Sequence, residues 1–242
     1  MIRLLLLAAI FCATAFAADP AADFDAANRL YEKGDYTGAI AAYQRIVSTG
    51  RASAAILFNL GNAYFKNAQP GRAIATLRAA QQLAPRDPDI RANLRFARGS
   101  VPGNNTRETT LDRLANVVSL NELGALSAVG LWLWFGLLAA GQFRPALKPQ
   151  LRTSVVATGI FAVAMTAWFA QGLISRATHR TAVVTAATAA VRFGPLDESQ
   201  IAFNVRDGNE LKVLAHKDKW VQVMDHSNRT GWIPAADLLE VP

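Results

Sequence analysis

Two long apolar runs constrain the fold of this 242-residue chain more than any other feature. They span residues 123–141 and 153–174, and neither contains Asp, Glu, Lys or Arg. A helix that crosses about 30 Å of hydrocarbon needs roughly 20 apolar residues. A pair of core helices in a soluble domain is the alternative, but such helices keep a polar stripe. We therefore predict a multi-domain membrane protein with two transmembrane helices, at 123–141 and 153–174.

Basic residues indicate the orientation of these helices. The loop at 142–152 contains Arg144, Lys148 and Arg152 and no acidic residue, and short cytoplasmic loops collect Lys and Arg. At the N-terminus, a short apolar stretch ends in the small-x-small pattern of a signal-peptidase site. We expect a signal peptide at 1–17, with an uncleaved anchor as the alternative. The loop would then be cytoplasmic, and both ends of the mature chain would lie outside the cytoplasm.

The net charge of +7 is not gathered on one face. Residues 18–122 hold 13 basic and 10 acidic residues, and residues 175–242 hold 8 of each. The other four basic residues lie in the signal peptide and the cytoplasmic loop. Because no dense cationic surface with interleaved aromatic residues is present, we expect no nucleic-acid partner.

Between residues 22 and 98 the sequence repeats itself at a spacing of 34 residues. The clearest matches pair Asn28 with Asn62, Tyr31 with Phe65, and Ala39-Ile40-Ala41 with Ala73-Ile74-Ala75. The second copy has Leu60-Gly61, Tyr64, Ala73 and Pro85, at the positions of the tetratricopeptide-repeat consensus. The segment therefore resembles tetratricopeptide repeats, whose unit is a pair of helices. The resemblance implies an all-α solenoid with repeats at 22–51 and 54–85.

Tetratricopeptide repeats bind extended peptides on the concave face that their first helices form. By resemblance, the peptide-binding residues here would be Phe24, Asn28, Tyr31, Phe58, Asn62, Phe65 and Lys66. Asparagine suits such a surface because its amide offers a peptide backbone both a donor and an acceptor. The alternative for each aromatic residue is that it only packs the solenoid.

A further helix is predicted at 88–98, where it would close the apolar end of the second repeat. Asp87 can cap its N-terminus, and apolar residues follow at helical spacing. Its other side carries Arg91, Arg95 and Arg98. We interpret these arginines as a solvated face rather than an anion site.

Residues 99–122 connect the solenoid to the first apolar run. Their first part has the composition of a loop. Apolar residues at 111–120 then share one helical face, which predicts an amphipathic juxtamembrane helix on the bilayer surface. Ser119 and Glu122 fit a capping box, so we expect the first membrane helix to begin near Ser119.

From residue 180 the chain consists of short β-rich runs divided by turn signals. This pattern favours a small antiparallel barrel. Four motifs resemble the bacterial SH3-like domain: Val191-Arg192-Phe193-Gly194-Pro195, Arg206-Asp207-Gly208, Trp220-Val221-Gln222-Val223 and Thr230-Gly231-Trp232-Ile233-Pro234. The resemblance implies a C-terminal all-β SH3-like barrel at 180–242. Residues 183–191 are rich in Ala and Thr, which predicts a poorly defined first strand.

Related SH3-like domains bind peptides or cell-wall material across aromatic surfaces. By resemblance, the ligand face would carry Phe203, Trp220 and Trp232. The alternative is that these rings close the barrel.

No set of residues typical of an enzyme site can be assembled. The histidines, His179, His216 and His226, lack metal-ligand spacing. The only cysteine, Cys12, lies in the predicted signal peptide, and no nucleophile elbow or phosphate-binding loop is present. We expect no catalytic residue, no metal ligand and no bound cofactor, and therefore no enzyme. An unrecognised hydrolase is the alternative, but the sequence offers no pair of nucleophile and base.

The order of these parts resembles the BatE family of the Bacteroides aerotolerance operon. That resemblance implies a bacterial inner-membrane protein whose two soluble domains are periplasmic. It also implies partners with von Willebrand A-type domains and a MoxR-type ATPase, in envelope stress or aerotolerance. We expect a scaffold for protein or peptide partners. The alternative is a sensor that binds peptidoglycan through the SH3-like domain, although the short cytoplasmic loop offers little surface for relaying a signal.

Overall fold

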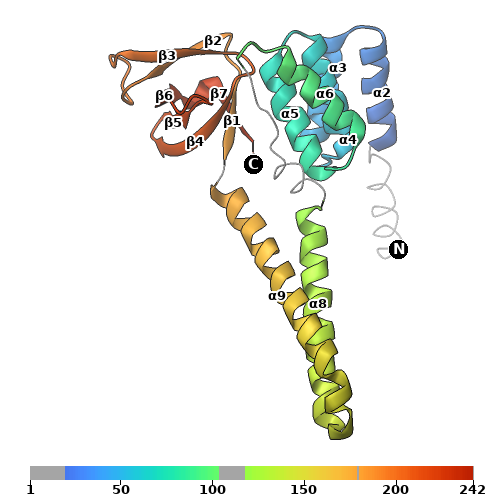
Figure 1. Ribbon diagram of the computed structural model, residues 1–242. Helices are drawn as coiled ribbons and strands as arrows, with labels where there is room; N and C mark the ends of the chain where they lie inside the picture. The colour runs from blue at the N-terminus through green and yellow to red at the C-terminus, as the bar shows by residue number, and fades with distance from the viewer. Residues whose placement is uncertain (1–19, 104–117, 179, 242) are drawn as a thin grey trace, which may run out of the picture.

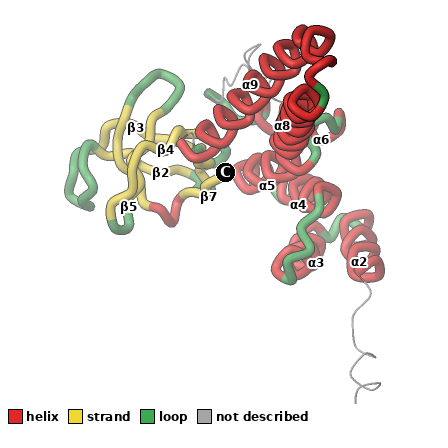
Figure 2. Tube along the Cα trace, turned by 90° about the horizontal axis from the view of Figure 1, so that it is seen from below, coloured by secondary structure: helices red, strands yellow, loops and turns green. Residues whose placement is uncertain are grey.

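The structure is a computed structural model that describes residues 20–103, 118–178 and 180–241. The predicted signal peptide and nearly all of the predicted juxtamembrane helix lie outside these residues. The described chain forms a helical solenoid, a hairpin of two long helices and a C-terminal sheet domain (Figure 1). The solenoid and the sheet domain lie side by side at the same end of the hairpin (Figures 1 and 2).

The solenoid consists of successive antiparallel helices with defined starts. Its helices are α2 (Pro20–Glu32), α3 (Tyr36–Ser48), α4 (Ala54–Lys66), α5 (Pro70–Leu83) and α6 (Pro88–Gly99). The side chains of Asp35, Ser53 and Asp87 accept backbone hydrogen bonds at the starts of α3, α4 and α6. Pro70 and Pro88 occupy first turns, where proline needs no partner for its nitrogen. Local chemistry therefore sets the predicted helix pairs and closing helix.

Small residues allow the paired helices to approach closely. Ala39 and Ala73 are completely buried. A Cβ atom added at Gly61 would lie 2.7 Å from Cγ of Leu77 on α5. Larger side chains, among them Tyr43 and Leu77, fill the space between the pairs. This is the packing that the repeat consensus predicts.

The hairpin is built from α8 (Leu120–Phe143) and α9 (Lys148–Thr178), joined by the short helix η1 (Pro145–Leu147). The predicted capping box is present: Ser119 Oγ accepts from the Glu122 amide, and the Ser119 amide donates to Glu122 Oε2. Both helices extend beyond the apolar runs, so the turn is shorter than the loop predicted at 142–152. By length and composition, each helix can cross a membrane.

Glycines line the contact between the hairpin helices. A Cβ at Gly130 would lie 3.2 Å from Phe161 on α9, and one at Gly159 would lie 2.8 Å from Nε1 of Trp134 on α8. Such small residues bring helix backbones together by van der Waals contact, as they do between membrane helices. Most other large apolar side chains of the hairpin point outward and are exposed.

The sheet domain is antiparallel, with the strand order β3-β2-β6-β5-β4-β1-β7. Its strands are β1 (Thr181–Val184), β2 (Thr188–Arg192), β3 (Ile201–Arg206), β4 (Glu210–Lys217), β5 (Trp220–Met224), β6 (Thr230–Pro234) and β7 (Leu238–Val241), with the short helix η2 (Ala235–Asp237) before β7. The sheet bends around one core to which all seven strands contribute.

The expectation of a poorly defined first strand is wrong. Residues 183–191 contain a bend between two separate strands, β1 and β2. β1 pairs with β4 on one side and β7 on the other, and its residues Ala182, Val183 and Val184 are fully buried. Val184 packs into the sheet-domain core, whereas Val183 packs against the solenoid. Burial on both faces stabilises a strand that its Ala and Thr neighbours do not predict.

Candidate functional site

The aromatic residues predicted for the peptide-binding face contribute to the packing of the solenoid. Phe24 on α2 contacts Tyr43, and Tyr31 contacts Tyr36 edge-on, with 5.4 Å between ring centroids. Phe58 and Phe65 on α4 are partly buried against an apolar cluster. Lys66, at the end of α4, is exposed. Each aromatic ring therefore keeps only part of its surface for a ligand.

Two equivalent asparagine pairs connect the first helices of the solenoid. Asn59 Nδ2 donates to Asn28 Oδ1 at 2.9 Å, which joins α4 to α2. Asn93 Nδ2 donates to Asn62 Oδ1 at 2.8 Å, which joins α6 to α4. Sequence reasoning selected Asn28 and Asn62 but missed their partners. The signal was available, because Asn59 and Asn93 are also 34 residues apart.

Tyr43 fixes the orientation of the first pair. Its hydroxyl donates to Asn28 Oδ1. Burial raises the pKa of Tyr43 to about 12, so the phenol stays protonated and remains a donor at neutral pH. Asn28 Oδ1 thus accepts two hydrogen bonds, one from Tyr43 and one from Asn59. The Nδ2 group of the same side chain takes part in neither.

The asparagine pairs retain unused polar groups. Among hydrogen bonds of the described residues, Asn28 and Asn62 use only Oδ1, and Asn59 and Asn93 use only Nδ2. Each pair therefore keeps an amide donor and a carbonyl acceptor. Along α2, α4 and α6 this chemistry matches the alternating groups of an extended peptide backbone.

The solenoid also contacts the sheet domain, through a shared apolar cluster. Its buried members come from α5, α6, the segment after α6, β1 and β7: Ile74, Ala75, Leu77, Leu94, Ala97, Val101, Val183 and Val241. In Figure 2 the C-terminal end of β7 lies beside α5. The two domains are therefore packed together and do not merely share a tether.

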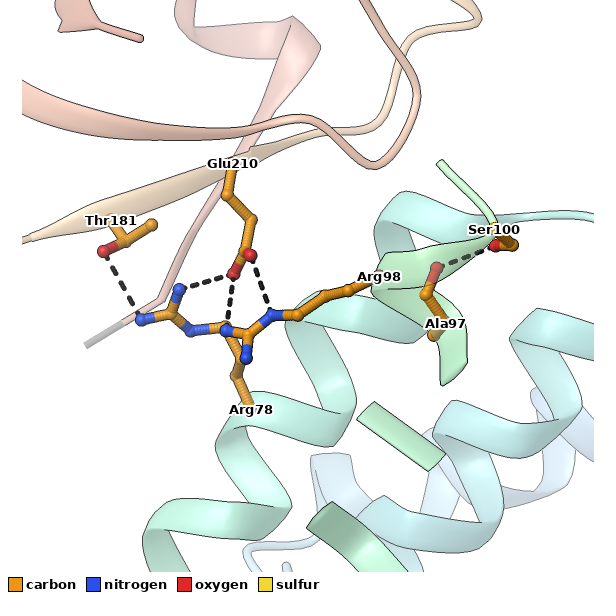
Figure 3. Close-up of polar contacts among 6 residues, drawn as sticks. All are labelled: Arg78, Ala97, Arg98, Ser100, Thr181 and Glu210. Atoms are coloured by element: carbon orange, nitrogen blue, oxygen red, sulfur yellow. Dashed lines mark hydrogen bonds and ion pairs between the residues drawn. The ribbon is translucent and has the colours of Figure 1, made fainter. Parts of the chain in front are cut away.

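A carboxylate buried between two arginines lies in this contact (Figure 3). Glu210 on β4 is 2% exposed. Arg98 on α6 donates to it from Nε at 2.8 Å and from Nη2 at 3.0 Å, and Arg78 on α5 donates from Nη1. Arg78 Nη2 also reaches Thr181 Oγ1 at 3.4 Å. We refer to Arg78, Arg98 and Glu210 as the interdomain ion cluster.

The arginines determine the charge state of Glu210. Loss of solvation on burial favours a higher pKa, but Arg98 and Arg78 outweigh it and hold the pKa of Glu210 below its usual range. The carboxylate is therefore ionised at neutral pH. The interpretation of Arg98 as part of a solvated face is wrong: its side chain is 14% exposed because the sheet domain covers it.

The turn before β4 contacts the N-terminus of α5. The Gly71 amide donates to Asp207 Oδ1 at 2.9 Å. A Cβ atom at Gly71 would clash with the carbonyl oxygen of Val184 and with the Asp207 carboxylate. Gly208 has a positive φ of 89°, and a Cβ there would lie 2.5 Å from Cγ2 of Val101. Glycine at both positions allows the domains to approach.

The proposed ligand face of the sheet domain is largely internal. Phe203 is 8% exposed and Trp220 is 3% exposed. The guanidinium group of Arg229 lies 4.4 Å from the centroid of the Phe203 ring. Of the three selected aromatic residues, Trp232 alone is only partly buried. Of the three selected residues, only Trp232 therefore has surface left for a ligand.

The solenoid is also connected to the hairpin. Arg86, after α5, donates to both carboxylate oxygens of Glu122 in the first turn of α8, each at 3.0 Å. Both side chains are exposed, so the pair serves more to orient than to stabilise. Among the described residues, no group of three or more His, Cys, Asp or Glu side chains could hold a metal ion.

Comparison with known protein families assigns both domains. A tetratricopeptide-repeat model matches residues 24–88. A bacterial SH3 domain model matches residues 185–240. These matches confirm the predicted tetratricopeptide repeats and SH3-like domain, and neither extends over the hairpin or beyond the start of α6. No curated protein matches the chain.

Proposed function

We propose that this chain is a non-enzymatic membrane scaffold that presents a peptide-binding solenoid and an SH3-like domain in the periplasm. The observation that carries this proposal is the packing of both domains against each other at one end of an apolar hairpin. Tetratricopeptide repeats and bacterial SH3 domains are both interaction modules. Placing them together raises the effective concentration of each for a shared partner.

The surface of the hairpin supports a membrane location. Large apolar side chains such as Trp132, Phe135 and Ile160 point outward and are exposed. A soluble protein rarely exposes so extensive an apolar surface. The 24 residues of α8 span about 36 Å at 1.5 Å per residue, enough to cross the hydrocarbon of a bilayer.

Basic residues support the orientation. Arg144, Lys148 and Arg152 lie at the turn between α8 and α9, and cytoplasmic segments collect such residues. The soluble domains occupy the opposite end of the hairpin (Figure 1). With the turn in the cytoplasm, both domains lie in the periplasm of a bacterial inner membrane.

The order of the domains supports a role in a Bat system. Tetratricopeptide repeats, an apolar hairpin and a C-terminal SH3-like domain follow one another as in the BatE family. We therefore propose partners with von Willebrand A-type domains, linked to a MoxR-type ATPase, in envelope stress or aerotolerance.

Site-specific crosslinking in cells tests the scaffold. A photoreactive amino acid replaces Lys66, which is exposed at the end of α4, or Lys212, which is exposed on β4. We expect membrane proteins with von Willebrand A-type domains to be captured from position 66. The same products from position 212 would indicate a partner that both domains share, whereas the absence of such products from position 66 would count against the proposal.

Peptidoglycan binding is the second candidate function, favoured by the bacterial SH3 match and the partly exposed Trp232. Sedimentation of the detergent-solubilised chain with purified sacculi tests it. Binding that is lost in Trp232→Ala supports a cell-wall sensor, whereas absence of the intact chain from the pellet argues against one.

A further inference from the structure

We propose that α6 forms a third wall of the peptide groove, and that the groove takes an extended peptide with an apolar side chain and no net negative charge. This inference rests on the proposed peptide-binding function of the solenoid. The match to the tetratricopeptide-repeat model ends at residue 88, where α6 begins, so that match gives α6 no part in peptide binding.

The 34-residue register continues through α6. Asn93 occupies the position of Asn59, and Phe96 occupies the position of Asn62. On α4, the positions that face α5 are those of Gly61 and Tyr64, which approach Leu77 and Arg72. Their equivalents on α6 are Arg95 and Arg98. α6 is thus the first helix of a third repeat, and the sheet domain packs where part of a second helix would lie.

The register places backbone-binding groups on three consecutive helices. The pair of Asn28 with Asn59 bridges α2 and α4, and the pair of Asn62 with Asn93 bridges α4 and α6. Each pair retains one amide donor and one carbonyl acceptor among the described contacts. A peptide that extends across all three helices can use both pairs, whereas a groove that ended at α4 would offer only the first.

Phe96 supplies an apolar subsite next to the second pair. It is 67% exposed, and its ring meets that of Phe65 edge-on, with 5.3 Å between centroids and 61° between planes. The pair has a fixed geometry, and Phe96 retains most of its surface. An apolar ligand side chain placed on it would remove that surface from water.

The charges along the same face oppose an acidic ligand. Asp25 on α2 occupies the position of Asn59 and Asn93, and Glu32 occupies the position of Lys66. All three charged side chains are exposed, which gives two carboxylates and one ammonium group. Arg98 faces the sheet domain and is paired with Glu210. A neutral or weakly basic peptide therefore fits this face better than an acidic one.

The test uses the full chain in lipid nanodiscs and a phage library that displays random 12-residue peptides. The consensus peptide is then synthesised with a fluorescent label, and its affinity is measured by anisotropy. We expect enriched peptides to be apolar and without excess acidic residues. Phe96→Ala should weaken binding about tenfold or more. Phe193→Ala, at a phenylalanine that is 68% exposed on the sheet domain, is the matched control and should change affinity less than about twofold.

The outcomes distinguish peptide binding by the solenoid from the role of α6 in it. If no peptide is enriched, both the proposed peptide-binding function and this inference fail. If peptides bind but Phe96→Ala behaves like Phe193→Ala, peptide binding stands and the role of α6 is overturned. Enrichment of acidic peptides, with affinity that falls steeply as salt rises, overturns the ligand class. Peptides whose binding is lost in Trp232→Ala and kept in Phe96→Ala place the site on the sheet domain and refute the inference.

Discussion

Replacing Glu210 by Gln should weaken the docking of the sheet domain on the solenoid without unfolding either one. The substitution keeps the shape of the side chain and removes its charge. Arg78 and Arg98 are then left with side chains that are 23% and 14% exposed and have no carboxylate between them. Breaking a buried ion pair by removing one partner costs about 3–5 kcal/mol.

Two features of the cluster reduce that figure. Both guanidinium groups keep some contact with water, and the glutamine oxygen still accepts one hydrogen bond. We therefore expect the free energy of interdomain docking to fall by about 2–3 kcal/mol. The apolar cluster around Val183 and Val241 remains, so the loss weakens docking and leaves both cores intact.

Spin labels at positions 33 and 217, both exposed lysines in the solenoid and the sheet domain, report docking by their distance distribution. We expect one narrow distribution in the parent chain and a broad one in Glu210→Gln. Glu240→Gln is the matched control, because Glu240 pairs with His216 on the exposed surface of the same domain. It should leave the distribution unchanged. A narrow distribution in both variants would refute the argument that the ion cluster holds the domains.

Acid should mimic this substitution. Because the arginines of the docked arrangement lower the pKa of Glu210 below its ordinary range, its contribution is complete at neutral pH and is lost as pH falls through that lowered pKa. The parent chain should therefore stay docked at neutral pH, and its distance distribution should broaden only in acid below the ordinary pKa range of a glutamate. Glu210→Gln should lack this component of the pH dependence. Equal acid responses in both chains would contradict the assignment.

Two further predictions concern the domain contact and the topology. Gly71→Ala places a methyl group against Val184 and Asp207 and should weaken docking by about 1–3 kcal/mol in the same distance measurement. Gly99→Ala is the control, because its methyl group meets no atom within 4 Å, and it should leave docking unchanged. Equal effects of the two substitutions would contradict the predicted clash at Gly71. A membrane-impermeant thiol reagent, applied to cells and to inverted vesicles, tests the topology. A cysteine at position 144 should react only from the cytoplasmic side, and a cysteine at position 217 only from the periplasmic side. Reaction of both cysteines from the same side would contradict the hairpin topology.

Local chemistry made the elements predictable from sequence. Asp87 and the Ser119–Glu122 capping box identified helix starts, and the 34-residue spacing identified the helix pairs. The ends of the hairpin helices were less accurate, because counting apolar residues stops at the first polar one. The helices continue through Gln142 and begin again at Lys148, since such residues are good helix formers.

The contact between the domains was not predictable in this way. Glu210 is 132 residues from Arg78 and 112 residues from Arg98, and no periodicity connects positions so far apart. At the start of a strand, Glu210 looks like an ordinary solvent-facing residue. Arg98 ends a series of arginines that a solvated helix face would equally contain. Only the docked arrangement shows that both arginines pair with this carboxylate.

The lack of any sequence signal for distant contacts also explains why the sequence predicts only a closing helix at α6. A helix after the last repeat needs only one apolar face, and the stripe of α6 satisfied that need. Its other two surfaces make different contacts: Asn93 and Phe96 meet Asn62 and Phe65 on the proposed groove, whereas Arg98 reaches Glu210. Because one helix carries both, the proposed groove and the sheet domain share a structural element, and a domain boundary at residue 98 separates segments that pack as one unit.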